Sequence, residues 1–153
     1  MPKTKKTIGI ADILDIPSAG IYKIPCKVDT GAYNCSIDCS YFGIVSIDNE
    51  SYLEYTLLGD EYTQKSSRKQ LTKNFIQKKV KSSNGVSEYR YQVELEVVIF
   101  ENKYKAIFNL SKRHNMKYPI LLGRKLLSKN FLVDVSRKNI SIGKTKKHLS
   151  YYL

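Results

Sequence analysis

The chain has 153 residues, and its 26 Lys and Arg against 14 Asp and Glu give a formal net charge of +12. This length fits one compact domain, and hydrophobic residues at 42% argue against a wholly disordered chain. No run approaches the roughly 18 apolar residues of a membrane span, and Asp12 and Asp15 interrupt the apolar stretch behind the basic N-terminus, so we expect neither a transmembrane helix nor a secretory signal.

Strand patterns dominate the first part of the chain. Residues 7–16 are rich in isoleucine and end at a Pro-Ser-Ala-Gly turn. Residues 21–28 alternate apolar and polar side chains, which is typical of a half-buried strand. Shorter strands are expected at residues 44–47 and 52–58.

The clearest alternation lies over residues 89–97, where Tyr91, Val93, Leu95 and Val97 share one face. Residues 101–103 predict a hairpin turn into a strand at 104–110, and residues 124–131, after Gly123, give the best helix signal. A last hairpin is expected from residues 132–135 and 139–143. These elements predict an all-β fold, a closed or sandwiched antiparallel barrel, in a single domain over residues 1–143 with a basic tail at 144–153.

Charge is unevenly distributed along the chain. Residues 62–87 hold no acid but contain seven cations, which are Lys65, Arg68, Lys69, Lys73, Lys78, Lys79 and Lys81. The tail from Arg137 onward is also basic and also without an acid. Such clusters attract phosphates or carboxylates by long-range steering, although an ordinary solvated face can carry the same residues.

The sulfur and imidazole side chains predict no metal site. Cys26, Cys35 and Cys39 form no C-x-x-C pair, and His114 and His148 are far apart in the sequence. We expect three reduced, partly buried thiols in a cytoplasmic protein, and no metal or other cofactor. No phosphate-binding glycine loop supports ATP binding.

Two segments carry candidate chemistry. Asp29 ends an apolar strand and is followed by Thr30 and the turn-permitting Gly31, although D-T-G alone is a weak signal. Residues 118–124 place apolar side chains and Gly123 before the expected helix. A glycine there lets the chain pass close behind a second loop, where a Cβ atom would collide.

At these residues the chain resembles the retropepsin-like aspartic proteases. Asp29–Ala32 is similar to their catalytic loop, and Ile120–Arg124 to their hydrophobic-hydrophobic-Gly-Arg segment. The resemblance is closest to the bacterial family often labelled "RimK-type" or "ATP-dependent zinc protease". It extends through the Ile8-Gly9 opening, the Ser82–Gly85 turn and the strand at Phe131–Asp134, and therefore covers nearly the whole chain.

The resemblance implies a closed acid-protease barrel and a set of site residues. Asp29, Thr30 and Gly31 would be catalytic, and Gly123 and Arg124 would support the loop or the dimer. A flap over about residues 71–91 would cover the cleft, turning at Asn84-Gly85, a strong hairpin signal. The substrate-binding residues would be Ala32, Ser83, Asn84, Gly85 and Leu122.

The implied chemistry is peptide hydrolysis by two carboxylates that share one proton. The chain offers a single D-T-G, so we expect a homodimer in which Asp29 of each subunit meets on a two-fold axis. Thr30 would then hydrogen-bond to the opposite subunit's loop. Tyr33 stands where viral retropepsins carry an aspartate, so the partner of Arg124 is open between Asp38, a backbone carbonyl and solvent.

The basic flap suggests an acidic, glutamate-rich peptide as substrate, in keeping with the family's association with RimK-like ligases that add glutamates to protein ends. Two other functions remain as alternatives. One is a non-catalytic retropepsin-like module that binds peptide without cutting it. The other, least favoured because charge alone is unspecific, is a basic β-barrel that binds nucleic acid. We expect no membrane partner.

Overall fold

A computed structural model describes residues 4–59, 69–112 and 117–142. The strands are β1 (Lys6–Ile8), β2 (Ala11–Ile16), β3 (Ile21–Val28), β4 (Cys35–Ile47), β5 (Glu50–Leu57), β6 (Lys69–Thr72), β7 (Ile76–Lys81), β8 (Ser87–Ile99), β9 (Asn102–Ser111), β10 (Ile120–Leu122) and β11 (Phe131–Val133). The helices are α1 (Arg124–Asn130) and the 3-10 turns η1 (Pro17–Ala19) and η2 (Ile140–Ile142). The expected basic tail at 144–153 lies outside the described residues, as do Lys65, Arg68, His114 and His148.

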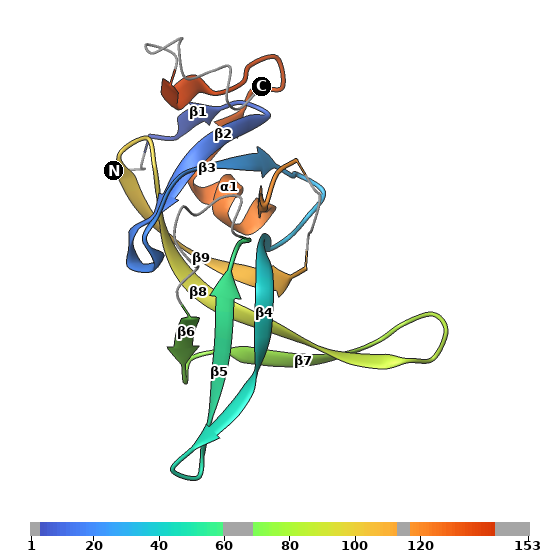
Figure 1. Cartoon of the computed structure of the whole chain (residues 1–153). Helices are drawn as coiled ribbons and strands as arrows, with labels where there is room; N and C mark the ends of the chain where they lie inside the picture. Colours follow the sequence, from blue (N-terminus) through green and yellow to red (C-terminus); the bar gives the residue numbers. More distant parts are fainter. Residues whose placement is uncertain (1–3, 60–68, 113–116, 143–153) are drawn as a thin grey trace.

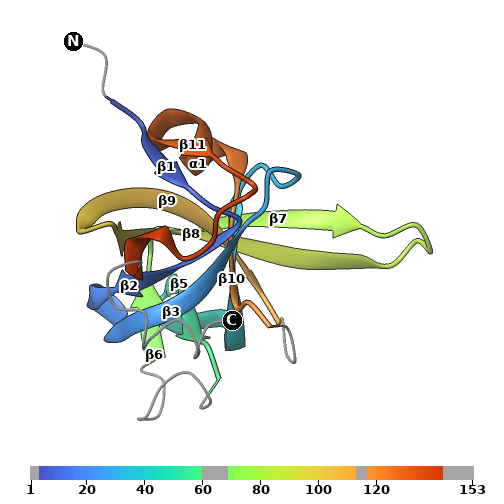
Figure 2. The ribbon, with the colours of Figure 1, turned by 90° about the horizontal axis from the view of Figure 1, so that it is seen from above.

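Six strands close into a barrel in the order β10-β3-β2-β8-β9-β4, because β10 also pairs with β4. Figure 1 shows the barrel with α1 against it, and Figure 2 shows the same body from above. The pairings β10–β3 and β4–β9 are parallel, whereas β2–β3 and β8–β9 are antiparallel. The all-β, closed-barrel expectation is confirmed, but the expected antiparallel pairing is wrong for β10–β3 and β4–β9. Among the described residues, no helix has the length and apolar character needed to cross a membrane.

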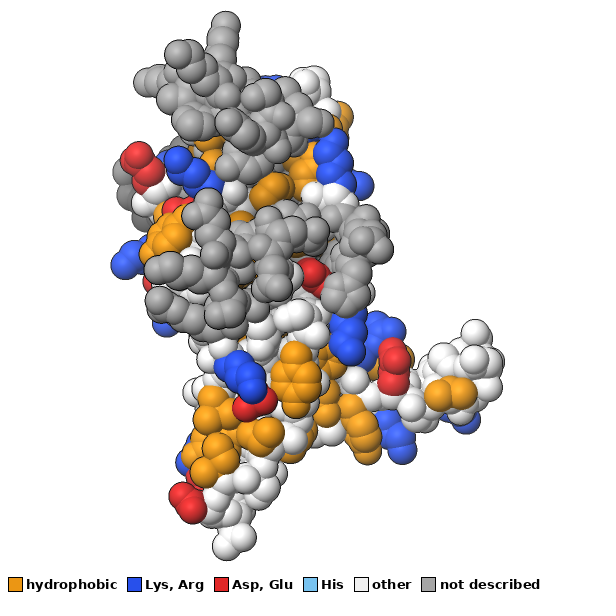
Figure 3. All heavy atoms as spheres, viewed as in Figure 1, with side chains coloured by type: hydrophobic (Ala, Val, Ile, Leu, Met, Phe, Trp, Pro, Cys, Tyr) orange, Lys and Arg blue, Asp and Glu red, His pale blue; other side chains and the backbone are white. Residues whose placement is uncertain are grey.

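Two extensions leave this barrel. The far halves of β4 and β5, joined by β6, form a small sheet with exposed hydrophobic side chains, among them Tyr41, Ile47 and Leu71. Figure 3 shows hydrophobic side chains gathered over the lower part of the molecule, where Figure 1 draws the far halves of β4 and β5. The second extension is a hairpin of β7 and the first part of β8, hereafter the arm, which projects sideways in Figures 1 and 2.

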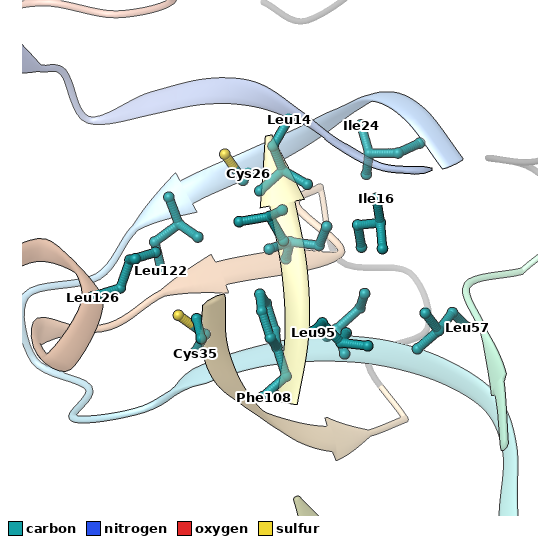
Figure 4. Close-up of a cluster of buried hydrophobic side chains, with 14 of the residues drawn as sticks. Leu14, Ile16, Ile24, Cys26, Cys35, Leu57, Leu95, Phe108, Leu122 and Leu126 are labelled. Carbon is teal, nitrogen blue, oxygen red and sulfur yellow. The ribbon is translucent and has the colours of Figure 1, made fainter. Parts of the chain in front are cut away.

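The core fills the inside of the barrel. Figure 4 shows side chains from several strands converging there, including Leu14, Cys26, Leu95 and Phe108. The alternation expected at residues 89–97 is confirmed, since all four apolar side chains on its one face are buried. Burial of each large apolar side chain stabilises the fold by about 1.5–3 kcal/mol.

Backbone turns set the strand lengths. Asp48 and Asn49 join β4 to β5, and Phe100 and Glu101 join β8 to β9; all four have positive φ, as two-residue hairpin turns require. The second turn therefore begins one residue before the expected 101–103. The strand expected at 44–47 is the end of β4, which starts at Cys35.

The expected last hairpin is wrong. Instead of pairing with residues 139–143, β11 pairs in parallel with β1, and Ile140–Ile142 forms the turn η2. The buried carboxylate of Asp12 explains this, because it accepts hydrogen bonds from the backbone N–H (3.2 Å) and the hydroxyl of Ser141. The Asn139 N–H donates to the carbonyl of Ala11 at 2.8 Å. The segment is thus fixed against β2.

Candidate active site

The loop after β3 holds Asp29 in a tight turn. The Asp29 N–H donates to the Leu122 carbonyl of β10 at 2.9 Å, and the Ala32 N–H donates to the Asp29 carbonyl at 3.2 Å. The Gly31 N–H donates to Asp29 Oδ1 at 3.0 Å. Asp29 is half-buried, while Thr30 and Gly31 are exposed. The turn therefore presents a carboxylate with one oxygen anchored by its own loop.

The chain between β10 and α1 passes directly behind this loop. An added Cβ on Gly123 would lie 2.4 Å from the Asn34 carbonyl oxygen and 2.7 Å from that of Tyr33. The Arg124 N–H donates to the Ala32 carbonyl at 2.8 Å, so the first residue of α1 also holds the loop. The close approach expected at Gly123 is confirmed.

The side chain of Arg124 also holds the turn at Asp29–Ala32. Its Nη1 donates to the Thr30 carbonyl at 3.1 Å, and its guanidinium lies 5.9 Å from the centre of the Tyr33 ring. Of the partners left open by the sequence, the structure places a backbone carbonyl at this guanidinium. Asp38 is buried in β4 with 2% exposure. Tyr33, which replaces the viral aspartate, contributes its ring face instead.

Two expected substrate-binding residues near the loop differ in exposure. Ala32 is half-buried beside Asp29, whereas the Leu122 side chain is fully buried among the core residues. Figure 4 shows Leu122 pointing toward the core, next to Leu126 of α1. The Leu122 side chain therefore points inward, because the side chains of β10 alternate between its two faces, and the expected substrate contact at Leu122 stays a prediction. The backbone carbonyl of Leu122 contacts the loop, because it accepts the hydrogen bond from the Asp29 N–H.

Most of the residues expected to form a flap lie in the arm, whose bounds are narrower than expected, and their role as a cover stays a prediction. The arm pairs β7 with β8 from Ile76 opposite Gln92 to Lys81 opposite Ser87, while Leu71 belongs to β6 and pairs with β5. Residues 82–86 make the turn at its tip. Figures 1 and 2 show the arm on the same side of the body as the loop that follows β3, with its tip extending beyond the barrel.

The tip turn is longer than a two-residue Asn-Gly turn, because only Gly85, and not Asn84, has a positive φ. Gly85 has φ +85°, and its N–H donates to the Ser82 carbonyl at 3.0 Å. The Ser82 hydroxyl contacts Asn84, and its N–H donates to the Val86 carbonyl at 2.9 Å. Ser83, Asn84 and Gly85 are all exposed, so their backbone groups are accessible to a substrate or to a second copy.

The lysines on the arm and those just before it differ in their pairing. Lys78, Lys79 and Lys81 are exposed on β7. Lys73 pairs with Glu50, which raises the pKa of that lysine, and Lys69 Nζ lies 3.9 Å from Glu54. The three lysines of β7 therefore present their charge to solvent, whereas the two lysines beside the arm are paired.

The three thiols are structural. Cys26, Cys35 and Cys39 are free and fully buried, more so than expected. Burial raises the pKa of each thiol, so the unreactive neutral form persists. Cys35 Sγ also accepts the Gly123 N–H at 3.5 Å. Within the described ranges, no three His, Cys, Asp or Glu side chains lie together as a metal site would need.

Sequence reasoning missed the base of the arm. There Arg90 Nη2 lies 3.0 Å from the Glu88 carboxylate, beside a pocket between β8 and β9. Opposite charges two residues apart on a strand share one face, and that spacing could have signalled the pair. The pocket could not have been inferred, since it depends on where two distant segments diverge.

Comparisons with known proteins agree with this geometry. A profile of the family described as "Retropepsin-like aspartic endopeptidase RimB" matches residues 8–144. A "Probable alpha-L-glutamate ligase" of Shewanella pealeana is 29% identical over 136 residues, covering 89% of this chain but 30% of that protein. A protein of the same description from Parasynechococcus marenigrum is 25% identical over 132 residues, covering 85% and 28%. This chain thus spans less than a third of these relatives.

Among solved structures, the protein Lpg0085 of unknown function from Legionella pneumophila has a TM-score of 0.67. It is 19% identical in sequence, and the match covers 90% of this chain and 99% of that one. At this identity the likeness concerns the fold alone.

Proposed function

This chain belongs to the RimB-like family of retropepsin-like aspartic endopeptidases, and on that premise we propose that it hydrolyses peptide bonds as a homodimer. Asp29 of each subunit supplies one carboxylate of the catalytic pair. The substrate is an acidic, glutamate-rich peptide.

The placement of Asp29 carries this proposal. Its Oδ1 is fixed by the Gly31 N–H, and among the described residues its second oxygen has no hydrogen-bond partner. Four further hydrogen bonds hold the turn: one within it, from the Ala32 N–H, and three to β10 and α1, which involve the Asp29 N–H, the Arg124 N–H and the Arg124 guanidinium. A carboxylate with one anchored and one free oxygen on a braced loop suits an acid–base role.

Two such carboxylates about 3 Å apart cannot both ionise, so the pair shares one proton. The ionised member takes a proton from a water molecule, which attacks the scissile carbonyl carbon. The protonated member donates to the carbonyl oxygen as charge develops there. The two apparent pKa values belong to the pair and not to either aspartate.

The dimer follows from the count of carboxylates. One D-T-G per chain gives half of the pair, and a two-fold axis through the loops supplies the other half. Thr30 and Gly31 are exposed at this place and can meet the second loop. The absence of a Cβ at Gly31 lets the two backbones approach.

Charge supports an acidic substrate. The net charge is +12, and Lys78, Lys79 and Lys81 lie exposed on the arm that would cover the cleft. Cations around a cleft raise the local concentration of anionic ligands. The curated relatives are described as glutamate ligases. A peptidase related to part of such proteins would reasonably act on peptides to which glutamates have been added.

The test compares the wild-type chain with Asp29→Asn on an oligoglutamate peptide and on an oligoglutamine peptide of equal length. We expect Asp29→Asn to lower the rate by about 10²–10⁴-fold or more, since one partner of the acid–base pair is lost. Sedimentation should give the same dimer for both chains. Full activity in a purified Asp29→Asn sample, or an active monomer, would overturn the proposal. Equal cleavage of both peptides, without dependence on ionic strength, would overturn the acidic substrate.

A further inference from the structure

A pocket of about 310 Å³ opens at the base of the arm, where β8 and β9 diverge. The two strands pair from Ile99–Asn102 as far as Gln92–Asn109, and beyond this point β8 continues into the arm with β7 on its other edge. The edge of β8 that faces the pocket therefore has no strand partner over residues 88–91 in the described part of the chain. Such an edge can accept an extended peptide by backbone pairing.

The charges around this pocket favour an anion. Arg90 and Lys112 line it, and Lys78 lies directly opposite Arg90 across the β7–β8 pair. Like charges directly opposite each other on a hairpin repel, and an anion between them removes that repulsion. Figure 3 shows Lys and Arg side chains together with an acidic one where the arm leaves the body.

The guanidinium of Arg90 is already paired with the carboxylate of Glu88. Glu88 Oε1 accepts from Arg90 Nη2 at 3.0 Å and from Arg90 Nε at 3.1 Å. Both residues are exposed, so the pair is weak and exchangeable. Both contacts go to one oxygen of Glu88, so an incoming carboxylate that binds through both of its oxygens can replace it at the same guanidinium.

A further donor lines the same pocket. The Ser111 hydroxyl is buried and has no hydrogen-bond partner among the described residues. Buried hydroxyls are nearly always paired, so an unpaired one beside a cavity suggests a ligand atom. Phe42 adds an apolar wall that can contact the aliphatic part of a side chain, and the Lys112 Nζ lies 5.9 Å from its ring centre.

We propose that this pocket binds a carboxylate side chain of the peptide, that Arg90 is the residue that recognises it, and that Glu88 occupies the guanidinium until the peptide displaces it. This inference rests on the proposed function, since it assigns a specificity pocket for the same substrate.

The distance from Asp29 to the pocket determines which residue of the peptide substrate the pocket can bind. Val28, next to Asp29, pairs with Leu122 of β10. The preceding residue, Leu121, pairs with Ser36 of β4, and Ser36 pairs with Asn109 at the pocket. Three strand spacings amount to roughly 14 Å, which is about four residues of extended peptide. The pocket therefore holds a side chain several residues from the scissile bond. Binding at that distance changes KM more than kcat.

The experiment measures binding without hydrolysis. A fluorescent oligoglutamate peptide is titrated into the Asp29→Asn chain at fixed ionic strength, and its anisotropy gives Kd. Adding Arg90→Ala should raise Kd about fivefold, while Glu88→Gln should lower Kd by removing the competing carboxylate. Lys103→Ala and Glu101→Gln, at the far turn between β8 and β9, make the same two charge changes remote from the pocket and should alter Kd less than about twofold.

Equal effects of Arg90→Ala and Lys103→Ala, or a Kd that rises with Glu88→Gln, would overturn the pocket. Stronger competition by a phosphopeptide than by oligoglutamate would also overturn the assignment to a carboxylate. The proposed function fails separately, through absent hydrolysis by the wild-type chain, because the binding assay contains no catalytic step.

Discussion

Replacing Gly123 with alanine perturbs the contact on which the candidate catalytic loop depends. The new Cβ would lie 2.4 Å from the Asn34 carbonyl oxygen, whereas real Cβ contacts stay above 3.0 Å, so the two segments must separate by at least the difference, 0.6 Å. The neighbouring atoms belong to the backbone and cannot rotate away. Overpacking of this kind costs about 1–3 kcal/mol.

The same substitution also brings a smaller gain in stability. Gly123 has φ −96°, which alanine adopts without strain, and Gly→Ala at such a site stabilises by about 0.4–1 kcal/mol through the unfolded chain. The collision outweighs this gain, so we expect the free energy of unfolding to fall by about 1–2 kcal/mol. A displacement approaching 1 Å at the catalytic loop should lower kcat about ten- to a hundredfold.

Urea unfolding and hydrolysis of oligoglutamate measure the two effects. Gly43→Ala is the matched control, because its Cβ would meet only the end of the Tyr41 side chain, which can move. That variant should stay within about 0.5 kcal/mol of the wild type. A Gly123→Ala chain as stable and as active as Gly43→Ala would refute the close approach of the two segments.

Three other predictions concern the supports of the site and the fold. Arg124→Ala removes the hydrogen bond to the Thr30 carbonyl and should lower kcat about tenfold. Arg124→Lys should restore only part of kcat, because lysine lacks the guanidinium plane that lies over the Tyr33 ring. Full activity of Arg124→Ala would contradict the role of Arg124 in holding the loop. Asp12→Asn should lower the free energy of unfolding in urea by about 1–3 kcal/mol, because one of the buried acceptor oxygens is lost. Asp15→Asn should lower it less, because the Asp15 carboxylate accepts a more exposed Lys23 N–H. Equal losses would contradict the anchoring of residues 139–142 by Asp12. Burial raises the pKa of the three thiols above the ordinary 9.0, so the folded protein holds these protons more tightly and this stabilisation, complete below pH 9, is lost as the pH rises further; a thiol reagent at pH 8 should label the chain only after unfolding, and rapid labelling of the native protein would contradict the burial.

The sequence could predict what local spacing encodes. The alternation from Tyr91 to Val97 can be recognised from neighbouring residues alone, and the turn at Asn84-Gly85 can be recognised from two residues. Gly123 could be predicted because a glycine between an apolar strand and a helix has few other reasons to be there. Each of these features is visible within one short window.

What the sequence could not predict depends on contacts between distant segments. The last hairpin fails because Ser141 bonds to Asp12, which lies 129 residues earlier. The strand β4 looked shorter than it is because Asp38 is buried within it and interrupts the apolar pattern. The inward direction of Leu122 depends on the register of β10 between β3 and β4, and no local rule gives that register.

The shortest barrel strand has a consequence for biosynthesis. β10 has three residues, yet it fills the gap between β3 and β4 and supplies the carbonyl that receives the Asp29 N–H. These residues leave the ribosome about ninety positions after Asp29 itself. A nascent or truncated polypeptide that stops before Ile120 therefore has an incomplete barrel and an unsupported aspartate turn. These supports form only after translation has passed the start of α1, because Arg124 also donates hydrogen bonds to the loop.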